Sequence, residues 1–378
     1  MAGIYIHIPF CRKRCHYCDF FKSTDFSQKV RLLAGLKKEL VSRASELTSE
    51  EINTIYLGGG TPSVLMIDEL KELLDIIRQN YQVSPEAEIT MEANPDDLSQ
   101  AILSAIREIG FNRLSMGVQS FSEADLKLMN RRHGVMQAVQ SVKWAKKAGF
   151  SNISIDLIYG LPNQNLEVWE RNVRIAVELD VQHISAYNLT YHEGTVFYDQ
   201  LKKGILKELP DELSLQQFEL LIKILKEAGF EHYEISNFCK PGLYSQHNSS
   251  YWKNKKYLGI GPSAHSFDFQ SRRWNVSSIP KYLQGLENGE TYSETEILTE
   301  QDRYNDYLIT SLRTIWGISE VFIQTEFPEK YFIQFQKIKE KYLQSGHLVS
   351  TPEIVTLSPE GLFISDQIMA DFMVVESC

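Results

Sequence analysis

The chain has few cysteines, no excess of positive charge and no long hydrophobic run. Only 5 of its 378 residues are cysteines, and this small, odd number argues against the disulfide framework of a small secreted domain. The 39 Lys and Arg are outnumbered by 49 Asp and Glu, giving a net charge of −10, which argues against a general nucleic-acid binder. No segment approaches the ~20 consecutive apolar residues needed to span a bilayer.

The N-terminal segment MAGIYIHIPFC also lacks the basic region and apolar core of a secretory signal peptide. We therefore expect a cytoplasmic protein, and peripheral contact with a membrane stays open. The composition, 43% hydrophobic and 23% charged, is that of an ordinary globular protein. At ~150 residues per domain, the length suggests two or three domains.

The first half of the chain alternates between β-rich segments and helical periodicity, which is typical of βαβ units and a parallel sheet. Strands are predicted at Gly3–Ile8, Asn53–Leu57, Glu88–Ala93, Arg113–Val118, Asn152–Leu157 and His183–Asn188. Helices are predicted at Lys29–Leu47, Ile67–Asn80, Ser99–Ile109, Met136–Ala148 and Leu166–Leu179. Six such units without a clear dinucleotide-binding fingerprint favour an α/β fold built as a partial, TIM-like (β/α)6 barrel.

Alternation within the predicted strands separates an apolar face from a polar one. In Glu88–Ala93 the apolar side chains share one face and Glu92 points to the other, and Gln119 and Asp156 occupy the polar faces of the next two strands. A barrel strand has one face under helices and one facing inward. We expect the polar side chains to point inward near the C-terminal strand ends, where barrel active sites are built.

The alternation stops near residue 290. We predict a barrel domain over residues 1–290 and a small α+β domain with a winged-helix-like order over residues 291–378. The most loop-like stretch is 237–275, which is rich in Asn, Ser, Gly and aromatic residues. Long loops in compact folds are usually functional.

Three of the five cysteines lie within eight residues, at Cys11, Cys15 and Cys18. Three thiolates at this spacing can hold one corner of a [4Fe–4S] cluster and leave one iron open to another ligand. The alternative is structural zinc, which needs a fourth ligand such as His7 or His16. No second CxxC pair follows, so the spacing fits common zinc patterns poorly.

The C-x3-C-x2-C window resembles that of the radical S-adenosylmethionine (SAM) superfamily. The opening segment from Tyr5 to Cys11 resembles that of the oxygen-independent coproporphyrinogen III oxidase group within it. Further matching segments are Gly58-Gly59-Gly60-Thr61-Pro62, Glu92-Ala93-Asn94-Pro95, Gly117-Val118-Gln119-Ser120-Phe121, Asn130-Arg131 and Asp156-Leu157-Ile158-Tyr159-Gly160-Leu161-Pro162. The resemblance covers nearly the whole chain.

The resemblance implies a [4Fe–4S] cluster on the three cysteines and a SAM site beside it. It assigns the glycine loop to the SAM amino group and Arg131 to the SAM carboxylate. The residues it implies for SAM are Tyr5, Tyr17, Gly59, Gly60, Thr61, Glu92, Gln119, Arg131 and Asp156. Structural alternatives are a tight turn for the glycines, hydrogen bonding inside the barrel for the polar residues and ordinary core packing for Tyr17.

Three features separate the chain from the oxidase and resemble the HemW haem chaperone family. The cysteine motif begins at residue 11, leaving no room for the oxidase's N-terminal extension, and Phe20 stands where the oxidase has a fourth cysteine. The segment His247-Asn248-Ser249-Ser250-Tyr251-Trp252 matches the H-N-x-x-Y-W signature associated with haem. The resemblance thus implies haem at His247, Tyr251 and Trp252. His265 is a rival ligand, and Cys239 and Cys378 are expected to be free thiols.

The leading hypothesis is a haem chaperone that binds a [4Fe–4S] cluster, SAM and haem and transfers haem to acceptor proteins. The radical SAM machinery is complete by these motifs, yet haem trafficking fits them better than a dedicated oxidase activity. The alternative is an oxygen-independent coproporphyrinogen III oxidase, which acts on a porphyrinogen by oxidative decarboxylation. A third hypothesis is a zinc-stabilised barrel that binds a ligand without redox chemistry.

Overall fold

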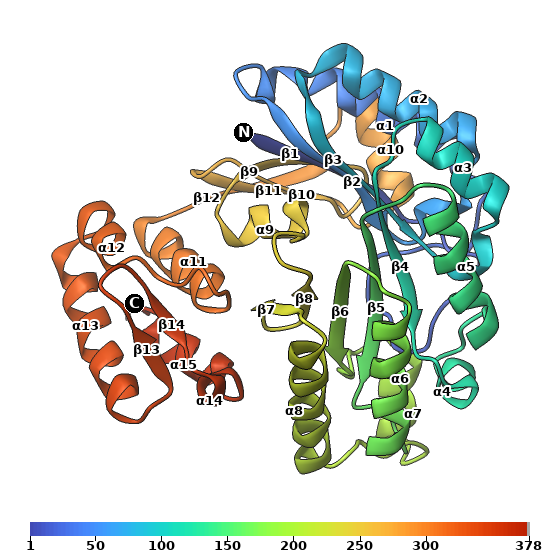
Figure 1. Ribbon diagram of the computed structural model, residues 1–378. Coiled ribbons are helices and arrows are strands. Elements are labelled where there is room, and N and C mark those ends of the chain that lie inside the picture. The colour runs from blue at the N-terminus through green and yellow to red at the C-terminus, as the bar shows by residue number, and fades with distance from the viewer. Residues whose placement is uncertain (376–378) are drawn as a thin grey trace.

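A twelve-stranded sheet forms the centre of the computed structural model, which describes residues 1–375. The strand order is β12-β11-β10-β9-β1-β2-β3-β4-β5-β6-β8-β7. Figure 1 shows the helices α1 to α6 on one side of this sheet and the C-terminal unit on the other. Cys378, one of the two expected free thiols, lies outside the described residues, and Cys239 is a buried free thiol.

Seven neighbouring strands of the sheet are parallel. Six of them follow chain order: β1 (Ala2–Ile8), β2 (Ile52–Gly59), β3 (Val83–Ala93), β4 (Arg113–Gln119), β5 (Ile153–Tyr159) and β6 (His183–Asn188). The seventh, β9 (Lys256–Ile260), pairs with β1 from much later in the chain. The predicted partial (β/α)6 barrel is confirmed.

The helices between these strands pack their apolar stripes on the sheet. They are α1 (Lys29–Ser42), α2 (Ile67–Asn80), α3 (Gln100–Glu108), α5 (Val135–Lys147) and α6 (Leu166–Glu178). The short helix α4 (Glu123–Leu128) instead contributes Leu126 to a separate hydrophobic cluster. In α2 the buried residues Leu70, Leu73, Leu74 and Ile77 form one helical stripe. The helix predicted to continue to Leu47 ends at Ser42, and a 3-10 turn covers Ala44–Leu47.

Elements at the two edges of the sheet were not predicted. At the β6 edge lie α7 (Val196–Lys202), α8 (Asp211–Glu227), β7 (Glu231–Glu234) and β8 (Asn237–Cys239). At the β1 edge lie α9 (Gln246–Trp252), β9, β10 (His265–Phe267), β11 (Ser271–Asn275), α10 (Ile279–Asn288) and β12 (Ser293–Ile297). The stretch 237–275, expected to be loop-like, thus carries four strands and a helix. Its elements span three to seven residues each, too short for their periodicity to stand out from the turn residues between them.

The C-terminal unit has its own hydrophobic core. Its elements are α11 (Glu300–Leu312), α12 (Glu320–Glu326), α13 (Glu329–Gln344), β13 (Leu348–Ser350), β14 (Val355–Leu357), α14 (Pro359–Leu362) and α15 (Ser365–Phe372). Leu308, Phe335 and Phe372 are among the buried residues of that core. Three helices followed by a hairpin is the winged-helix-like order predicted. Because β12 still pairs with β11, we propose that the first unit extends to Ile297 rather than to residue 290.

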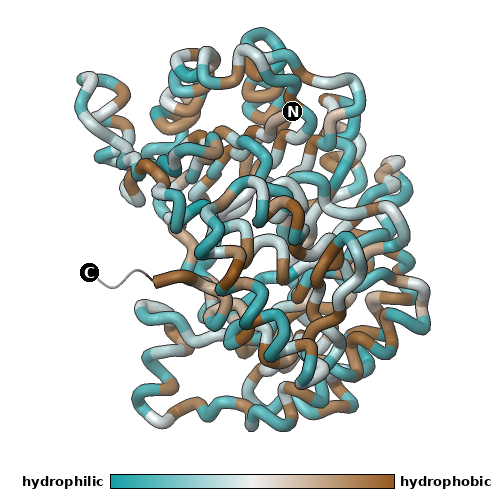
Figure 2. The backbone as a smooth tube through the Cα atoms, turned by 90° about the vertical axis from the view of Figure 1, so that its left-hand side faces the viewer, coloured by the Kyte–Doolittle hydropathy of each residue, from teal (hydrophilic) through white to brown (hydrophobic). Residues whose placement is uncertain are grey.

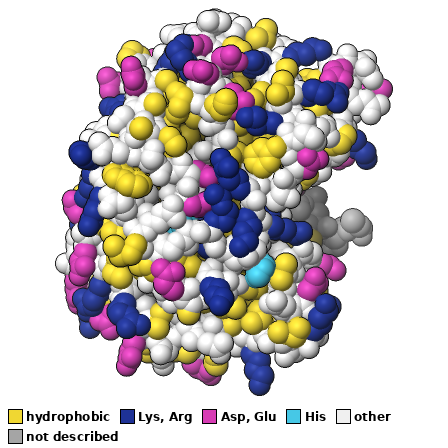
Figure 3. Space-filling model, turned by 90° about the vertical axis from the view of Figure 1, so that its right-hand side faces the viewer, with side chains coloured by type: hydrophobic (Ala, Val, Ile, Leu, Met, Phe, Trp, Pro, Cys, Tyr) yellow, Lys and Arg dark blue, Asp and Glu magenta, His cyan; other side chains and the backbone are white. Residues whose placement is uncertain are grey.

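Hydrophobic residues are distributed in short stretches along the chain. In Figure 2 brown and teal segments alternate along most of the tube, as amphipathic elements require. No helix within residues 1–375 is long and apolar enough to cross a membrane. On the face seen in Figure 3, acidic, basic and hydrophobic side chains are interspersed.

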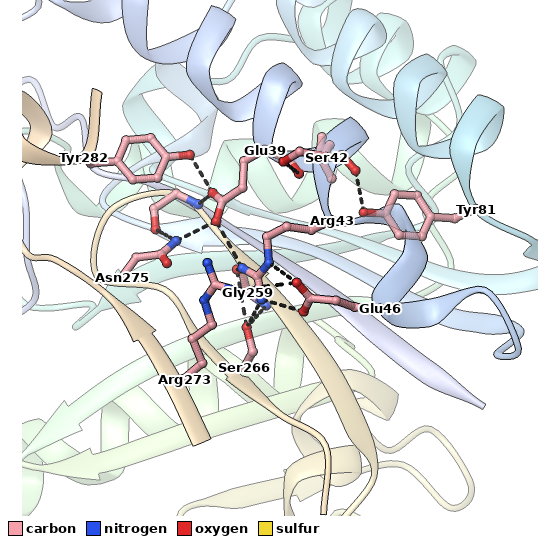
Figure 4. A network of polar contacts seen from close by, with 12 residues as sticks. Glu39, Ser42, Arg43, Glu46, Tyr81, Gly259, Ser266, Arg273, Asn275 and Tyr282 are labelled. Carbon is pink, nitrogen blue, oxygen red and sulfur yellow. Dashed lines mark hydrogen bonds and ion pairs between the residues drawn. The ribbon is translucent and has the colours of Figure 1, made fainter. Parts of the chain in front are cut away.

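A buried polar network joins α1 to the β9–β11 edge of the sheet (Figure 4). Glu39, which is fully buried, accepts hydrogen bonds from Gly261 N (2.8 Å), Asn275 Nδ2 (2.9 Å) and the Tyr282 hydroxyl (2.5 Å). Arg43 Nη1 donates to Glu39 at 3.0 Å and to the Gly259 carbonyl at 2.9 Å. The network therefore holds the turn between β9 and β10 against α1.

Candidate functional site

A cavity of about 430 Å³ lies at the C-terminal ends of the parallel strands. Glu92 from β3, Gln119 from β4 and Asp156 from β5 line it, while Met91, Leu114 and Ile155 of the same strands are buried in the core. The predicted division of these strands into an apolar and an inward polar face is thus confirmed. Cys11, Cys15 and Cys18 line the same cavity.

The three cysteines follow β1 in an irregular segment. Cys11 is buried, and its Sγ lies 3.3 Å from the Thr61 hydroxyl. Cys15 accepts a hydrogen bond from Arg131 Nη1 at 3.3 Å, and Lys22 Nζ donates to the Cys18 carbonyl at 2.6 Å. The cationic side chains of Arg131 and Lys22 therefore lie against the segment that carries the three thiols.

The donor set suits an iron–sulfur cluster. Three thiols on one cavity wall are soft ligands, and Cys15 and Cys18 are close enough to Cys11 to act on its ionisation. Burial raises the pKa of Cys11 to about 11, and a metal bound to such a thiol favours its ionised form. Among residues 1–375, no three His, Cys, Asp or Glu side chains are arranged as ligands of a single metal ion.

The glycine turn after β2 approaches β1 closely. Gly59 has a φ of +101°, and a Cβ there would lie 2.5 Å from the His7 ring. A Cβ on Gly60 would lie 2.7 Å from the Ile8 carbonyl oxygen. Packing between β1 and β2 thus explains these glycines, and both also line the cavity with Thr61.

Glu92 is held from two sides. The Tyr56 hydroxyl donates to it at 2.7 Å and Gly59 N at 3.1 Å. Burial raises the pKa of Glu92 to about 7, because a charged carboxylate is poorly solvated inside the barrel. Sequence reasoning missed Tyr56, although its place on β2, opposite Thr90 of β3, could have indicated an inward side chain.

Asp156 lies beside a second residue that sequence reasoning missed. Burial raises the pKa of Asp156 to about 6, and the positive charge of Arg113 opposes that rise. Arg113 is 1% exposed and lines the cavity. Its Nε and Nη1 atoms make no hydrogen bond with the described residues. The floor of the cavity therefore combines two carboxyl groups of raised pKa with one buried guanidinium.

Gln119 and Arg131 occupy constrained positions. Gln119 has a left-handed φ of +70° at a register shift between β4 and β5, a conformation that a non-glycine residue adopts only when its surroundings impose it. Arg131 Nη2 donates to Asn94 Oδ1 at 2.6 Å. Arg131 Nε is buried without a partner among the described residues, and Arg131 also lines the cavity.

The two tyrosines predicted for SAM lie in different places. Tyr17 lines the first cavity and packs beside the buried residues Leu126 and Met129, so it belongs both to a hydrophobic cluster and to the cavity wall. Tyr5 does not line the first cavity. It lines an adjoining one, and its hydroxyl lies 3.1 Å from His7 Nδ1.

This second cavity has a volume of about 400 Å³ and an aromatic wall. It adjoins the first because Phe20, Gly59 and Glu92 line both. Its other lining residues are Tyr5, His7, Phe21, Tyr251, Tyr257, Ser263 and His265. Phe20 is 67% exposed.

The three predicted haem residues lie on α9, but their side chains do not line one common cavity. His247 is 1% exposed. Its Nδ1 lies 2.8 Å from the Thr54 hydroxyl and its Nε2 lies 2.8 Å from the Tyr251 hydroxyl. Tyr251 lines the second cavity. Trp252 instead faces the C-terminal unit, where the guanidinium of Arg313 lies 4.3 Å from its ring centre.

Comparisons with known proteins identify the family and the fold. Residues 5–176 match the family model of the radical SAM superfamily. The chain is 35% identical over 380 residues to the heme chaperone HemW of Bacillus subtilis, covering 99% of each chain. It is 35% identical over 334 residues to HemW of Lactococcus lactis, covering 88% of this chain and 86% of that one.

The solved structure of the radical SAM enzyme coproporphyrinogen III oxidase (HemN) from Escherichia coli shares the fold. It matches with a TM-score of 0.85 at 25% identity, over 98% of this chain and 89% of that one. Because the identity to HemW proteins exceeds 30% over the full length of both chains, the chain belongs to the HemW heme chaperone family of the radical SAM superfamily.

Proposed function

We propose that this chain is a haem chaperone that holds a [4Fe–4S] cluster, binds SAM beside it and passes haem to acceptor proteins. The observation that carries the proposal is one cavity lined by three thiols, by Arg131 and by the carboxyl groups of Glu92 and Asp156. Membership of the HemW family supports the haem part of the proposal.

The residues of the first cavity have distinct tasks in this proposal. Cys11, Cys15 and Cys18 hold the cluster, which supplies an electron to SAM when bound. Arg131, which lines the cavity, pairs its guanidinium with the SAM carboxylate. Glu92 accepts hydrogen bonds from the ammonium group of SAM and, with Asp156, balances the charge of the sulfonium. Tyr56 orients Glu92 through its hydroxyl.

The likeness to HemN keeps a second candidate function in view, a coproporphyrinogen III oxidase. Phe20 favours the chaperone because, by family resemblance, the oxidase has a cysteine at that position. An exposed phenylalanine between two cavities offers an apolar surface for a macrocycle and no thiol for chemistry.

A pair of assays on the anaerobically reconstituted protein separates the two functions. Loaded with haem, the protein is expected to transfer it to a haem-free acceptor such as apomyoglobin, followed by the acceptor's absorption spectrum. Given coproporphyrinogen, SAM and a reductant, it is expected to release no carbon dioxide. Decarboxylation without haem transfer would reverse the assignment.

SAM affinity is expected to increase between about pH 6 and about pH 8, because the pKa of Glu92 is raised to about 7 and only the carboxylate attracts the cationic SAM. Glu92→Gln should bind SAM roughly tenfold more weakly at pH 8, the scale of one charge-assisted hydrogen bond. The SAM affinity of this variant should also depend less on pH. The pH dependence that remains would come from Asp156, whose pKa is raised to about 6. Equilibrium dialysis with labelled SAM measures both effects. A Glu92→Gln variant that keeps the full wild-type pH dependence would contradict the prediction.

A further inference from the structure

The second cavity contains one histidine whose ring nitrogens are free. His7 lines it too, but His7 Nε2 lies 2.9 Å from the Phe21 carbonyl and Nδ1 lies 3.1 Å from the Tyr5 hydroxyl. For His265, neither nitrogen hydrogen-bonds to any residue in the described part of the chain, and the residue is exposed. Metal ligation needs a nitrogen with an available lone pair.

His247, in contrast, is built into the barrel wall. Both its nitrogens are within 2.8 Å of hydroxyl groups, and its ring stacks on Tyr56 with 5.0 Å between ring centres. Tyr56 in turn donates to Glu92. A Cβ on Gly3 would lie 3.2 Å from the His247 ring, which shows how closely the backbone surrounds it. His247 therefore supports the first cavity through Tyr56. To bind an iron, it would have to break at least one of its two hydrogen bonds.

The turn between β9 and β10, which leads directly into His265, is held by several hydrogen bonds. Glu39 accepts from Gly261 N, and Arg43 donates to the Gly259 carbonyl and to the Ser266 hydroxyl (3.1 Å), on either side of His265 (Figure 4). A Cβ on Gly259 would lie 1.9 Å from the His265 carbonyl oxygen, so this backbone contact needs glycine. Ser263 adopts a left-handed φ of +65° in the same turn. Such preorganisation is typical of a ligand site.

The surroundings of His265 suit a flat aromatic ligand. Trp274 stacks beside its ring, with 6.3 Å between ring centres. Tyr257 and Tyr251 pack edge to face on the cavity wall, 4.6 Å apart, and Phe20 and Phe21 line the cavity with them. Although His265 is exposed, partial desolvation and the positive charge of Arg272 lower its pKa, which favours the neutral imidazole that can bind iron.

We propose that haem occupies the second cavity with His265 as a ligand of its iron, and that His247 is a positioning residue that holds Tyr251 and Tyr56 in place. This inference rests on the proposed haem-binding function, and it assigns the iron ligand to His265 instead of His247. Because Glu92 and Phe20 line both cavities, the bound haem would lie next to the SAM site.

Titration of the full-length protein with ferric haem, followed by absorption spectroscopy, tests the assignment. His265→Ala is expected to shift the Soret band and to weaken binding by roughly tenfold or more, since even loss of an outer-sphere partner of a metal ligand costs about that much. Added imidazole should restore the wild-type spectrum. The matched control is His347→Ala, which removes an imidazole from the C-terminal unit and should bind haem like the wild type.

Two outcomes would overturn the assignment and leave the proposed function intact. One is a His265→Ala variant with the wild-type band and affinity. The other is imidazole rescue of His247→Ala but not of His265→Ala. Wild-type protein that binds no haem would overturn the proposed function together with this inference.

Discussion

Replacing Cys15 with alanine is expected to lower the iron content of the anaerobically reconstituted protein from about four per chain to near zero. The proposed site offers the cluster three thiolates, and Phe20 adds no fourth. Cys15 also accepts a hydrogen bond from Arg131, so its loss removes a ligand and leaves a guanidinium near the remaining thiols. Iron and sulfide analysis and the absorption spectrum of the reconstituted protein measure the effect.

Cys239→Ala is the matched control for this variant. Cys239 is a buried free thiol on β8, outside the first cavity, and its removal should leave the iron content unchanged. A Cys15→Ala protein that still holds about four irons would contradict the three-cysteine site. Stoichiometric zinc and no iron in the wild type would favour the zinc-stabilised barrel instead.

Replacing Glu39 with alanine is expected to lower the free energy of unfolding by about 3–5 kcal/mol, the usual cost of removing one partner of a buried ion pair. Glu39 is fully buried and Arg43 is 4% exposed. Without the carboxylate, the Arg43 charge loses its buried partner, and Gly261 N, Asn275 and Tyr282 lose an acceptor. Urea denaturation of the purified protein measures the loss.

Glu46→Ala is the control for this prediction, because Glu46 pairs with the same arginine at 2.7 Å but its side chain is 39% exposed. Solvent screens such a pair, so its loss should cost no more than about 1 kcal/mol. The double variant Glu39→Ala/Arg43→Met removes both charges and should recover part of the stability. A Glu39→Ala variant as stable as Glu46→Ala would show that the network is not a major source of stability.

The Glu39 network also links stability to the proposed haem site. Its acceptor and donor atoms hold Gly259, Gly261 and Ser266, which flank His265 in the chain. We therefore expect Glu39→Ala to weaken haem binding even at temperatures where the protein stays folded. Glu46→Ala should bind haem like the wild type.

Local patterns in the sequence determined much of the barrel. Alternation in β3, β4 and β5 identified Glu92, Gln119 and Asp156 as inward-facing, because successive side chains of a strand point to opposite faces whatever surrounds it. The spacing of Cys11, Cys15 and Cys18 placed three thiols within one short segment. The order of three helices and a hairpin in the C-terminal unit could also be predicted from local sequence, since each element is bounded by its own turn residues.

Only the tertiary structure decided which distant residues meet. It placed β9 beside β1, some 250 residues apart in the chain, and this pairing brought His265 to the wall of a cavity with Tyr5 and Phe20. It also showed that His247 has both nitrogens engaged, while Arg113 and Tyr56 lie at the first cavity. Sequence periodicity reports which face of an element is apolar, but a free lone pair or a shared cavity depends on partners that packing brings together.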